Sequence, residues 1–224
     1  MALAKRYNAS GPAEPATYLV GRITTAVEAG QRVLWLMSGG SCIAVAVAVA
    51  YQLQAVPAGQ ISLGLIDERY GPVGHPDSNY QQLIDAGFRL PGAQLRPMIV
   101  ADMTAAAAAQ AYAAWLEVEL AAADLTIGLY GLGADGHTAG LLPGSPALGA
   151  SALVAAYQGS DFERVTTTPV LMERLTEAVV YALGPGKSSA VARLLSGWPS
   201  GTDDVDAPPA HRLLQAPKLT IYTD

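Results

Sequence analysis

Several residue types that often point directly to a function are scarce in this sequence. Among its 224 residues there is a single cysteine, Cys42, so no disulfide can form within the chain and no paired-cysteine zinc motif is present. Only three lysines occur, Lys5, Lys187 and Lys218, and the formal net charge is −6. A nucleic-acid-binding protein presents a basic face to the phosphate backbone, so this composition argues against a nucleic-acid partner.

Long hydrophobic runs are also missing. The longest one, CIAVAVAVAY at residues 42–51, is well short of the roughly 20 apolar residues that a membrane helix needs. The first 20 residues contain no continuous apolar stretch followed by a small-residue cleavage site, so nothing in them suggests secretion. Together with the single cysteine, these absences predict a cytoplasmic protein without a membrane partner.

What the sequence does contain is a regular alternation of apolar and helix-forming segments. Short, nearly continuous apolar runs are typical of strands buried on both faces of a parallel sheet. They occur at 32–37, 61–66, 125–130 and 178–183, with a further predicted strand at 218–223. Longer segments rich in alanine, leucine and glutamine lie between them at 16–30, 78–87 and 104–123. This order predicts one domain over residues 1–224, a doubly wound α/β fold with a mainly parallel, Rossmann-like sheet flanked by helices.

Two further segments need interpretation. The Ala/Val alternation at 42–51 has the period of a strand, but the segment follows a predicted strand and an SGGS turn. Because a parallel crossover needs a helix there, we predict a helix. The proline- and aspartate-rich segment at 198–210 is interpreted as a surface loop.

In open α/β sheets ligands bind beyond the carboxyl ends of the strands, so the loops that follow strands are the places to search. After the first strand, Gly39, Gly40 and Ser41 precede a helix N-terminus, an arrangement that suits phosphate but that also serves as a simple turn. After the second strand come Asp67 and Arg69. Arg69 could clamp a phosphate or carboxylate and Asp67 could bind sugar hydroxyls, or the two could form a local ion pair.

The third loop, GLGADGHTAGLLPG at 131–144, contains the glycine spacing G-x-G-x-x-G. A dinucleotide site would need a long helix after the third glycine and an acidic residue about 20 positions on. Pro143 and Pro146 exclude that helix, and residues 150–158 contain no carboxylate. The chemistry that remains is His137, which is suited to general acid/base catalysis, with Asp135 placed to fix its tautomer. A purely structural histidine is the alternative.

The fourth loop places Lys187 after a GPG turn and before a predicted helix. The segment is not a nucleotide P-loop, because Tyr181 stands where the motif requires glycine. Lys187 is therefore a candidate phosphate contact or an exposed charge at a helix start. No G-x-S-x-G elbow and no metal-ligand spacing occurs, so neither a serine hydrolase nor a zinc enzyme is expected.

Taken in order, SGGS, DERY, HPDSNY, GLGADGHTAGLLPGSPAL, ERVTTTPVL and GPGKSSAVARLL closely resemble the 6-phosphogluconolactonases of the sugar-phosphate isomerase/lactonase superfamily. The resemblance implies metal-independent hydrolysis of 6-phospho-D-glucono-1,5-lactone in the oxidative pentose phosphate pathway, without a cofactor. It implies that His137 is the general base that activates water, with Asp135 beside it and Asp67 at the sugar. It places Gly39, Gly40, Ser41, Arg69 and Lys187 around the substrate phosphate. The expected partner is a small phosphosugar lactone, and the expected assembly is a monomer or weak homo-oligomer.

The same superfamily contains glucosamine-6-phosphate deaminases, and two positions separate them from this sequence. Arg69 stands where the deaminases have tyrosine, and Leu142 stands where they carry a catalytic glutamate. Since leucine cannot transfer a proton, the resemblance favours the lactonase. The alternatives are a deaminase- or isomerase-like enzyme and a non-catalytic sugar-phosphate-binding paralogue. Many lactonases have Thr-Pro after the two glycines, whereas this chain has Ser41 and Cys42.

Overall fold

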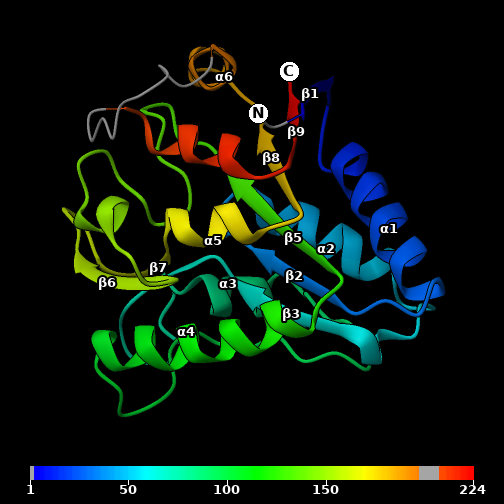
Figure 1. Cartoon of the computed structure of the whole chain (residues 1–224), viewed down its shortest axis with the longest axis horizontal. Helices are drawn as coiled ribbons and strands as arrows, with labels where there is room; N and C mark the ends of the chain where they lie inside the picture. Colours follow the sequence, from blue (N-terminus) through cyan, green and yellow to red (C-terminus); the bar gives the residue numbers. More distant parts are fainter. Residues whose placement is uncertain (1–2, 197–206) are drawn as a thin grey trace.

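A computed structural model describes residues 3–196 and 207–224 (Figure 1). Its main element is a sheet of six strands, every neighbouring pair of which is parallel. In spatial order these strands are β1 (Leu3–Asn8), β9 (Lys218–Thr223), β8 (Glu177–Ala182), β5 (Leu125–Gly131), β2 (Val33–Met37) and β3 (Ile61–Leu65). The predicted α/β class with a parallel sheet is confirmed, and the five predicted strands appear within one residue of their expected limits.

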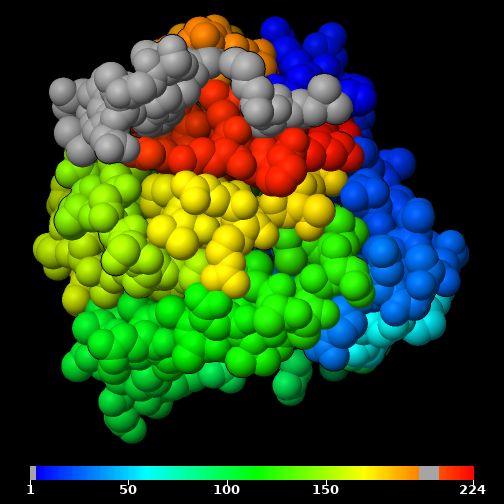
Figure 2. Space-filling view, viewed as in Figure 1, coloured from blue at the N-terminus to red at the C-terminus, as the bar shows by residue number. Residues whose placement is uncertain are grey.

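Helices flank this sheet. They are α1 (Ala13–Glu28), α2 (Cys42–Gln52), α3 (Asn79–Asp85), α4 (Ala105–Ala122), α5 (Pro169–Arg174) and α6 (Ser188–Leu195), with 3₁₀ turns η1 (Ala58–Gln60), η2 (Pro146–Gly149) and η3 (Pro209–Gln215). Figure 2 shows α4, α5 and η3 as green, yellow and red bands across one face of the molecule. No helix in the described ranges combines the length and apolar character that crossing a membrane requires.

The helix at α2 shows why its alternating sequence did not become a strand. Its buried residues are Cys42, Val45, Ala46, Val49 and Ala50, which follow the helical spacing of one face. The remaining alanines and valines lie on its less buried side, and α2 packs against α1. The prediction of a helix here is confirmed, and it rests on the crossover that two parallel strands demand.

Helix α4 contacts the sheet through a polar anchor. The hydroxyl of Tyr112 accepts a hydrogen bond from the backbone N–H of Leu65 at 2.7 Å and donates one to the carbonyl of Leu65 at 2.9 Å. Gly64 makes the close approach possible, since a Cβ there would lie 2.4 Å from the Tyr112 hydroxyl. These hydrogen bonds fix Leu65, the last residue of β3, two residues before Asp67.

Two parts of the structure differ from the expectations. Asp67–Arg69, interpreted as part of a loop, forms a short strand β4, which pairs antiparallel with β7 (Glu163–Thr167), and β7 pairs antiparallel with β6 (Val154–Gln158). This small second sheet was not predicted, and neither was β1. Most of the segment at 198–210, interpreted as a surface loop, lies outside the described residues, and its last two residues begin η3.

Candidate active site

The eight residues singled out from the sequence line one cavity of about 520 Å³. They are Gly39, Gly40, Ser41, Asp67, Arg69, Asp135, His137 and Lys187. The same cavity is lined by Ser38, Asn79, Gly131, Leu132, Gly133, Ala139, Leu142, Asp161 and Arg164. Four loops that are far apart in the sequence therefore meet at one place.

Register explains why these loops meet. Met37 at the end of β2 lies opposite Leu65 on β3 and opposite Leu129 on β5, so the three strands end at nearly the same level. The chain leaves each of them at the carboxyl edge of the sheet, where ligands of open α/β folds bind. Lys187 arrives at this edge from the loop after β8, as the residue that precedes α6.

Asp135 and His137 form the chemically most distinctive contact in the cavity. Asp135 Oδ1 lies 2.7 Å from His137 Nδ1 and accepts the backbone N–H of His137 at 3.0 Å. Partial burial raises the pKa of Asp135, but its hydrogen bonds with His137 and the histidine's charge outweigh burial and hold that pKa below the usual value. An ionised Asp135 favours a hydrogen on Nδ1, so the lone pair of the ring is on Nε2. The imidazole is 42% exposed, so water can reach it.

Glycines shape the turn that carries this pair. Gly133 donates its N–H to the His137 carbonyl at 2.8 Å, and a Cβ on Gly133 would lie 2.2 Å from His137 Nδ1. Gly136 has a φ of +89°, a conformation that other residues rarely adopt. After this turn the chain enters a β-bridge between Thr138 and Leu141 and then η2, rather than the helix of a dinucleotide site. The glycine spacing thus serves the Asp135–His137 contact.

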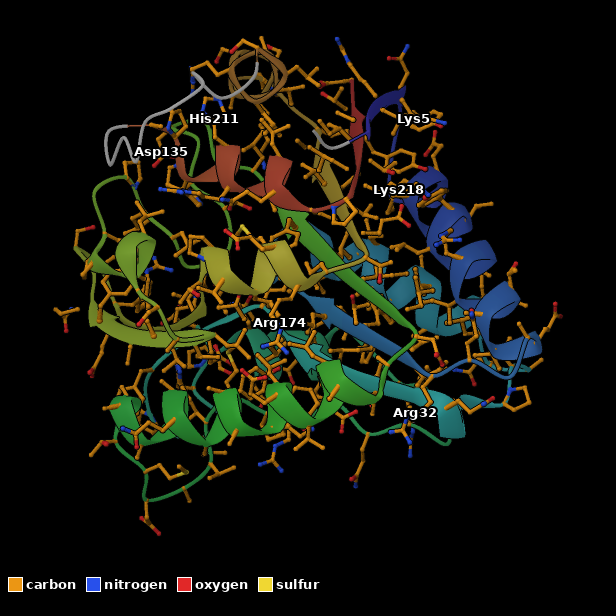
Figure 3. All side chains as sticks on the ribbon, in the orientation of Figure 1. Lys5, Arg32, Asp135, Arg174, His211 and Lys218 are labelled. Carbon is orange, nitrogen blue, oxygen red and sulfur yellow. The ribbon has the colours of Figure 1, made fainter. Side chains whose placement is uncertain are left out.

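Residues from α6 and η3 also hold the turn that carries Asp135 and His137. Arg193 on α6 donates through Nη2 to the carbonyl of Ala134 at 2.7 Å, and the N–H of Ala210 reaches the carbonyl of Gly136 at 3.0 Å. Figure 3 labels Asp135 and His211 on the same side of the molecule, where η3 passes the turn. The loop that carries His137 and the helix that follows Lys187 are therefore directly connected.

The two neighbouring carboxylates of β4 differ in role. Glu68 is buried and accepts from Ser78 Oγ at 2.9 Å and from the backbone N–H groups of Arg69, Asn79 and Tyr80 at 2.8, 2.6 and 3.0 Å. It fixes the start of α3. Burial raises the pKa of Glu68, against the lowering effect of these hydrogen bonds.

Asp67 faces the cavity and has fewer partners. Its Oδ2 accepts from Asn79 Nδ2 at 3.3 Å, and its carbonyl accepts from the same nitrogen at 2.9 Å. Burial raises the pKa of Asp67, while the nearby charges of Arg69 and Arg164 pull it down without cancelling that rise. Asn79 also packs closely against the loop that follows β2, since a Cβ on Gly39 would lie 1.9 Å from the Asn79 Oδ1.

The first loop is a tight turn. Cys42 and Ile43 donate to the carbonyls of Gly39 and Gly40 at 3.3 and 3.1 Å, and Gly40 has a φ of +60°. Ser41 is exposed beside the N-terminus of α2 and makes no side-chain cap. The thiol of Cys42 is fully buried, and burial raises its pKa to about 12, so it is not a thiolate nucleophile.

Three cationic side chains reach the cavity: Arg69, Arg164 and Lys187. Arg69 donates through Nη1 to the carbonyl of Asp77 at 2.9 Å, and Arg164 donates through Nη2 to both carboxylate oxygens of Asp161. Sequence reasoning missed Arg164, Asp161 and the individual role of Asn79, although the motifs that contain Arg164 and Asn79 had been singled out. Within the described residues, no three or more His, Cys, Asp or Glu side chains are arranged to hold a metal ion.

A second, larger cavity of about 750 Å³ lies along the edge strand β3 and the segment 88–97. None of the eight predicted residues lines it. It is lined instead by Ile61, the first residue of β3, at the opposite end of that strand from the smaller cavity. The smaller cavity combines a histidine–carboxylate pair with three cations at the carboxyl edge of the sheet. We therefore take it as the candidate active site.

Several known proteins resemble this chain in sequence and fold. The family model of glucosamine-6-phosphate isomerases/6-phosphogluconolactonase matches residues 11–221. A 6-phosphogluconolactonase of Mycobacterium tuberculosis is 33% identical over 208 residues, which cover 86% of this chain and 83% of that protein. The crystal structure of a 6-phosphogluconolactonase from Shewanella baltica superimposes with a TM-score of 0.78 at 20% identity, covering 100% of this chain and 98% of that one.

The fold by itself does not separate the activities of these proteins. A monomeric glucosamine-6-phosphate deaminase superimposes with a TM-score of 0.76 at 17% identity, covering 98% of this chain and 97% of that one. The choice between a lactonase and a deaminase therefore depends on residues in the site.

Proposed function

The chain belongs to the family of glucosamine-6-phosphate isomerases and 6-phosphogluconolactonases, as one of its lactone hydrolases, and we propose how its site opens the lactone ring. The substrate is 6-phospho-D-glucono-1,5-lactone and the product is 6-phosphogluconate. The observation that carries the mechanism is the 2.7 Å contact between Asp135 Oδ1 and His137 Nδ1 at the wall of a cavity that also contains Arg69 and Lys187.

Phosphate binding positions the substrate. Arg69 and Lys187 supply positive charge, and the turn of Gly39, Gly40 and Ser41 adds its own backbone N–H groups and the dipole of the α2 N-terminus. Anchoring the phosphate at one end of the sugar places the lactone carbonyl within the cavity, which converts an encounter with water into a reaction at a fixed site. Asp67 accepts hydrogen bonds from sugar hydroxyls.

His137 acts as the general base. Its Nε2 takes a proton from water as the water oxygen attacks C1 of the lactone. The tetrahedral intermediate collapses with cleavage of the bond between C1 and the ring oxygen, and the proton passes from His137 to that oxygen. The carboxylic acid product then ionises. Backbone N–H groups of the glycine turn that carries His137 are the donors available to the developing oxyanion.

The lining of the cavity favours the lactonase over the deaminase. Leu142, at the position where the deaminases resembling this chain carry glutamate, is one of the lining residues. Deamination through a histidine-linked relay needs an ionisable group there, and leucine has none. A lactone is an activated ester, so its hydrolysis needs a water, a base and oxyanion donors but no second carboxylate.

A single assay separates the candidate functions. The chain is mixed with freshly prepared 6-phosphogluconolactone, and acid release is followed and corrected for spontaneous hydrolysis. A parallel reaction contains glucosamine 6-phosphate, and ammonia is measured. Catalysed acid release without ammonia supports the proposal. Ammonia release would establish the deaminase, and binding of 6-phosphogluconate without any turnover would establish a non-catalytic sugar-phosphate-binding protein.

A further inference from the structure

Two arginines lie opposite each other on neighbouring strands of the small sheet. In the pairing of β4 with β7, Arg69 lies directly opposite Arg164. The Cβ atoms of residues in such cross-strand positions lie about 5 Å apart, and like charges there destabilise the pairing. An anion between or beside the two guanidinium groups relieves this repulsion.

The surroundings of both arginines leave hydrogen-bonding capacity unused. The ring of Phe162 lies 5.6 Å from Cζ of Arg69 and 5.8 Å from Cζ of Arg164, so both guanidinium groups stack near one aromatic side chain. The Nε atoms of both arginines are buried and have no hydrogen-bond partner within residues 3–196 and 207–224. Buried N–H groups of a cation are costly when unpaired, so the pair is set up for a ligand.

Asp161 supplies a carboxylate to one of the two arginines. Its Oδ1 and Oδ2 lie 2.9 and 2.8 Å from Arg164 Nη2. The side chain of Arg164 is only 8% exposed, whereas that of Asp161 is 49% exposed and belongs to the turn between β6 and β7. Arg164 is the more deeply buried member of this ion pair. Asp161, whose Oδ1 also accepts the backbone N–H of Phe162 at 2.8 Å, lies at the solvent side of the cavity.

The charges in the cavity are balanced without a substrate. Asp67, Asp135 and Asp161 oppose Arg69, Arg164 and Lys187. A phosphate dianion that enters this cavity gains most when a carboxylate gives up its arginine, because that guanidinium can then take two phosphate oxygens in its planar fork. Asp161 is the most suitable carboxylate, since it is half exposed and regains water when it leaves.

We propose that Arg69 and Arg164 form a two-arginine clamp for the phosphate of the substrate, and that Asp161 is an internal anion that occupies Arg164 in the empty site and is displaced by that phosphate. This inference rests on the proposed function. It makes Arg164 a specificity-determining residue for phosphorylated lactones, and it makes Asp161 a competitor that weakens phosphate binding and speeds product release.

Titration calorimetry with 6-phosphogluconate tests the role of Asp161. Removing the competitor in Asp161→Asn should tighten binding roughly two-fold to five-fold, the usual worth of a partly exposed ion pair. Glu163→Gln is the matched control, because it removes the same charge from the same strand region but does not line the cavity, and its affinity should equal that of the wild type. Weaker or unchanged binding by Asp161→Asn would show that Asp161 merely supports Arg164, and would overturn the internal-anion role.

Arg164→Gln tests the clamp itself. It should weaken 6-phosphogluconate binding by about 10-fold to 100-fold, as expected for loss of hydrogen bonds to a charged group. The kcat/KM for the phosphorylated lactone should fall by a similar factor, while hydrolysis of unphosphorylated glucono-1,5-lactone should change little. Equal losses for the two lactones would overturn the assignment. The binding titrations need no turnover, so a failed lactonase assay would reject the proposed function and leave the clamp separately testable.

Discussion

Two buried carboxylates lie near opposite ends of the main sheet, Glu177 at the start of its strand β8 and Asp67 just beyond the carboxyl end of β3, and they differ in how well they are paired. Glu177 opens β8 at the amino end and is fully buried. It accepts hydrogen bonds from the Tyr18 hydroxyl, from Arg22 Nε at 3.0 Å and from Thr220 Oγ1 at 3.2 Å, and Lys218 Nζ lies 3.2 Å away. Figure 3 labels Lys218 on the right of the view, far from Asp135 on the left.

The buried polar groups at the carboxyl end of the sheet have fewer hydrogen-bond partners. Asp67 has one side-chain partner, Asn79, and Ser38 Oγ, Asn79 Oδ1 and Arg164 Nε are buried without a hydrogen bond among the described residues. Buried polar groups are normally paired, so a concentration of unpaired ones at one cavity indicates that their partner is a ligand. The Glu177 cluster therefore holds the fold together, whereas the cavity retains polar capacity for substrate at a cost in stability.

The largest expected effect is a loss of activity without a loss of stability, caused by a substitution in the cavity. His137→Ala should lower kcat by about 100-fold to 10,000-fold, the span of general acid–base catalysis, because no other base replaces Nε2. The melting temperature should change little, since the ring is 42% exposed. Steady-state kinetics and a thermal melt on the same preparation provide the two readouts. Near-normal kcat would remove His137 from the mechanism.

Asp135→Asn should have the next largest effect. We expect kcat to fall about 10-fold to 100-fold, because the amide no longer favours a hydrogen on Nδ1 of His137. Asp135 is a positioning residue, so ring-nitrogen NMR of His137 should show a loss of that tautomer together with the loss of rate. A variant with reduced kcat but an unchanged tautomer would contradict the role given to the 2.7 Å contact.

At the other end of the sheet, Glu177→Gln should change stability rather than chemistry. A glutamine places an amide N–H group among donors from Tyr18, Arg22 and Lys218, which leaves buried hydrogen bonds unmade. The free energy of unfolding should fall by about 1–3 kcal/mol. Urea denaturation measures this loss, and kcat of the folded protein should stay at the wild-type value. A large loss of kcat with normal stability would show that Glu177 serves the reaction and not the fold.

Much of the fold and part of the site could be predicted from the sequence, for identifiable reasons. The central strands are buried on both faces and therefore appear as continuous apolar runs. Asp135 and His137 are two residues apart, so their contact is local. Edge strand β1 was missed because Lys5 and Arg6 make it polar, as is common at sheet edges.

The small sheet and its arginine pair could not be found in this way. Strands β6 and β7 are five residues each and mix polar with apolar positions. Arg164 faces Arg69 only because of the register between β4 and β7, which is a tertiary property that spacing in the sequence does not give. The Glu177 cluster was missed for the same reason, since its members come from α1, β8 and β9.

The cavity keeps the carboxyl of Asp67 buried with a single side-chain partner, in a position to bind substrate. Burial raises the pKa of Asp67 in the folded chain, so its ionisation opposes folding as pH rises through that pKa. Asp67→Asn removes this cost. The most direct measurement is the melting temperature of this variant and the wild type at pH 7 and below about pH 4, the usual aspartate pKa.

We expect Asp67→Asn to melt about 2–4 °C higher than the wild type at pH 7, as for a stabilising change of about 1 kcal/mol. The difference should disappear well below about pH 4, where Asp67 is protonated in both the folded and the unfolded chain. Lactone turnover by the variant should be reduced. A variant that melts below the wild type at pH 7 would contradict this expectation, because Asp67 would then stabilise the fold as Glu177 does.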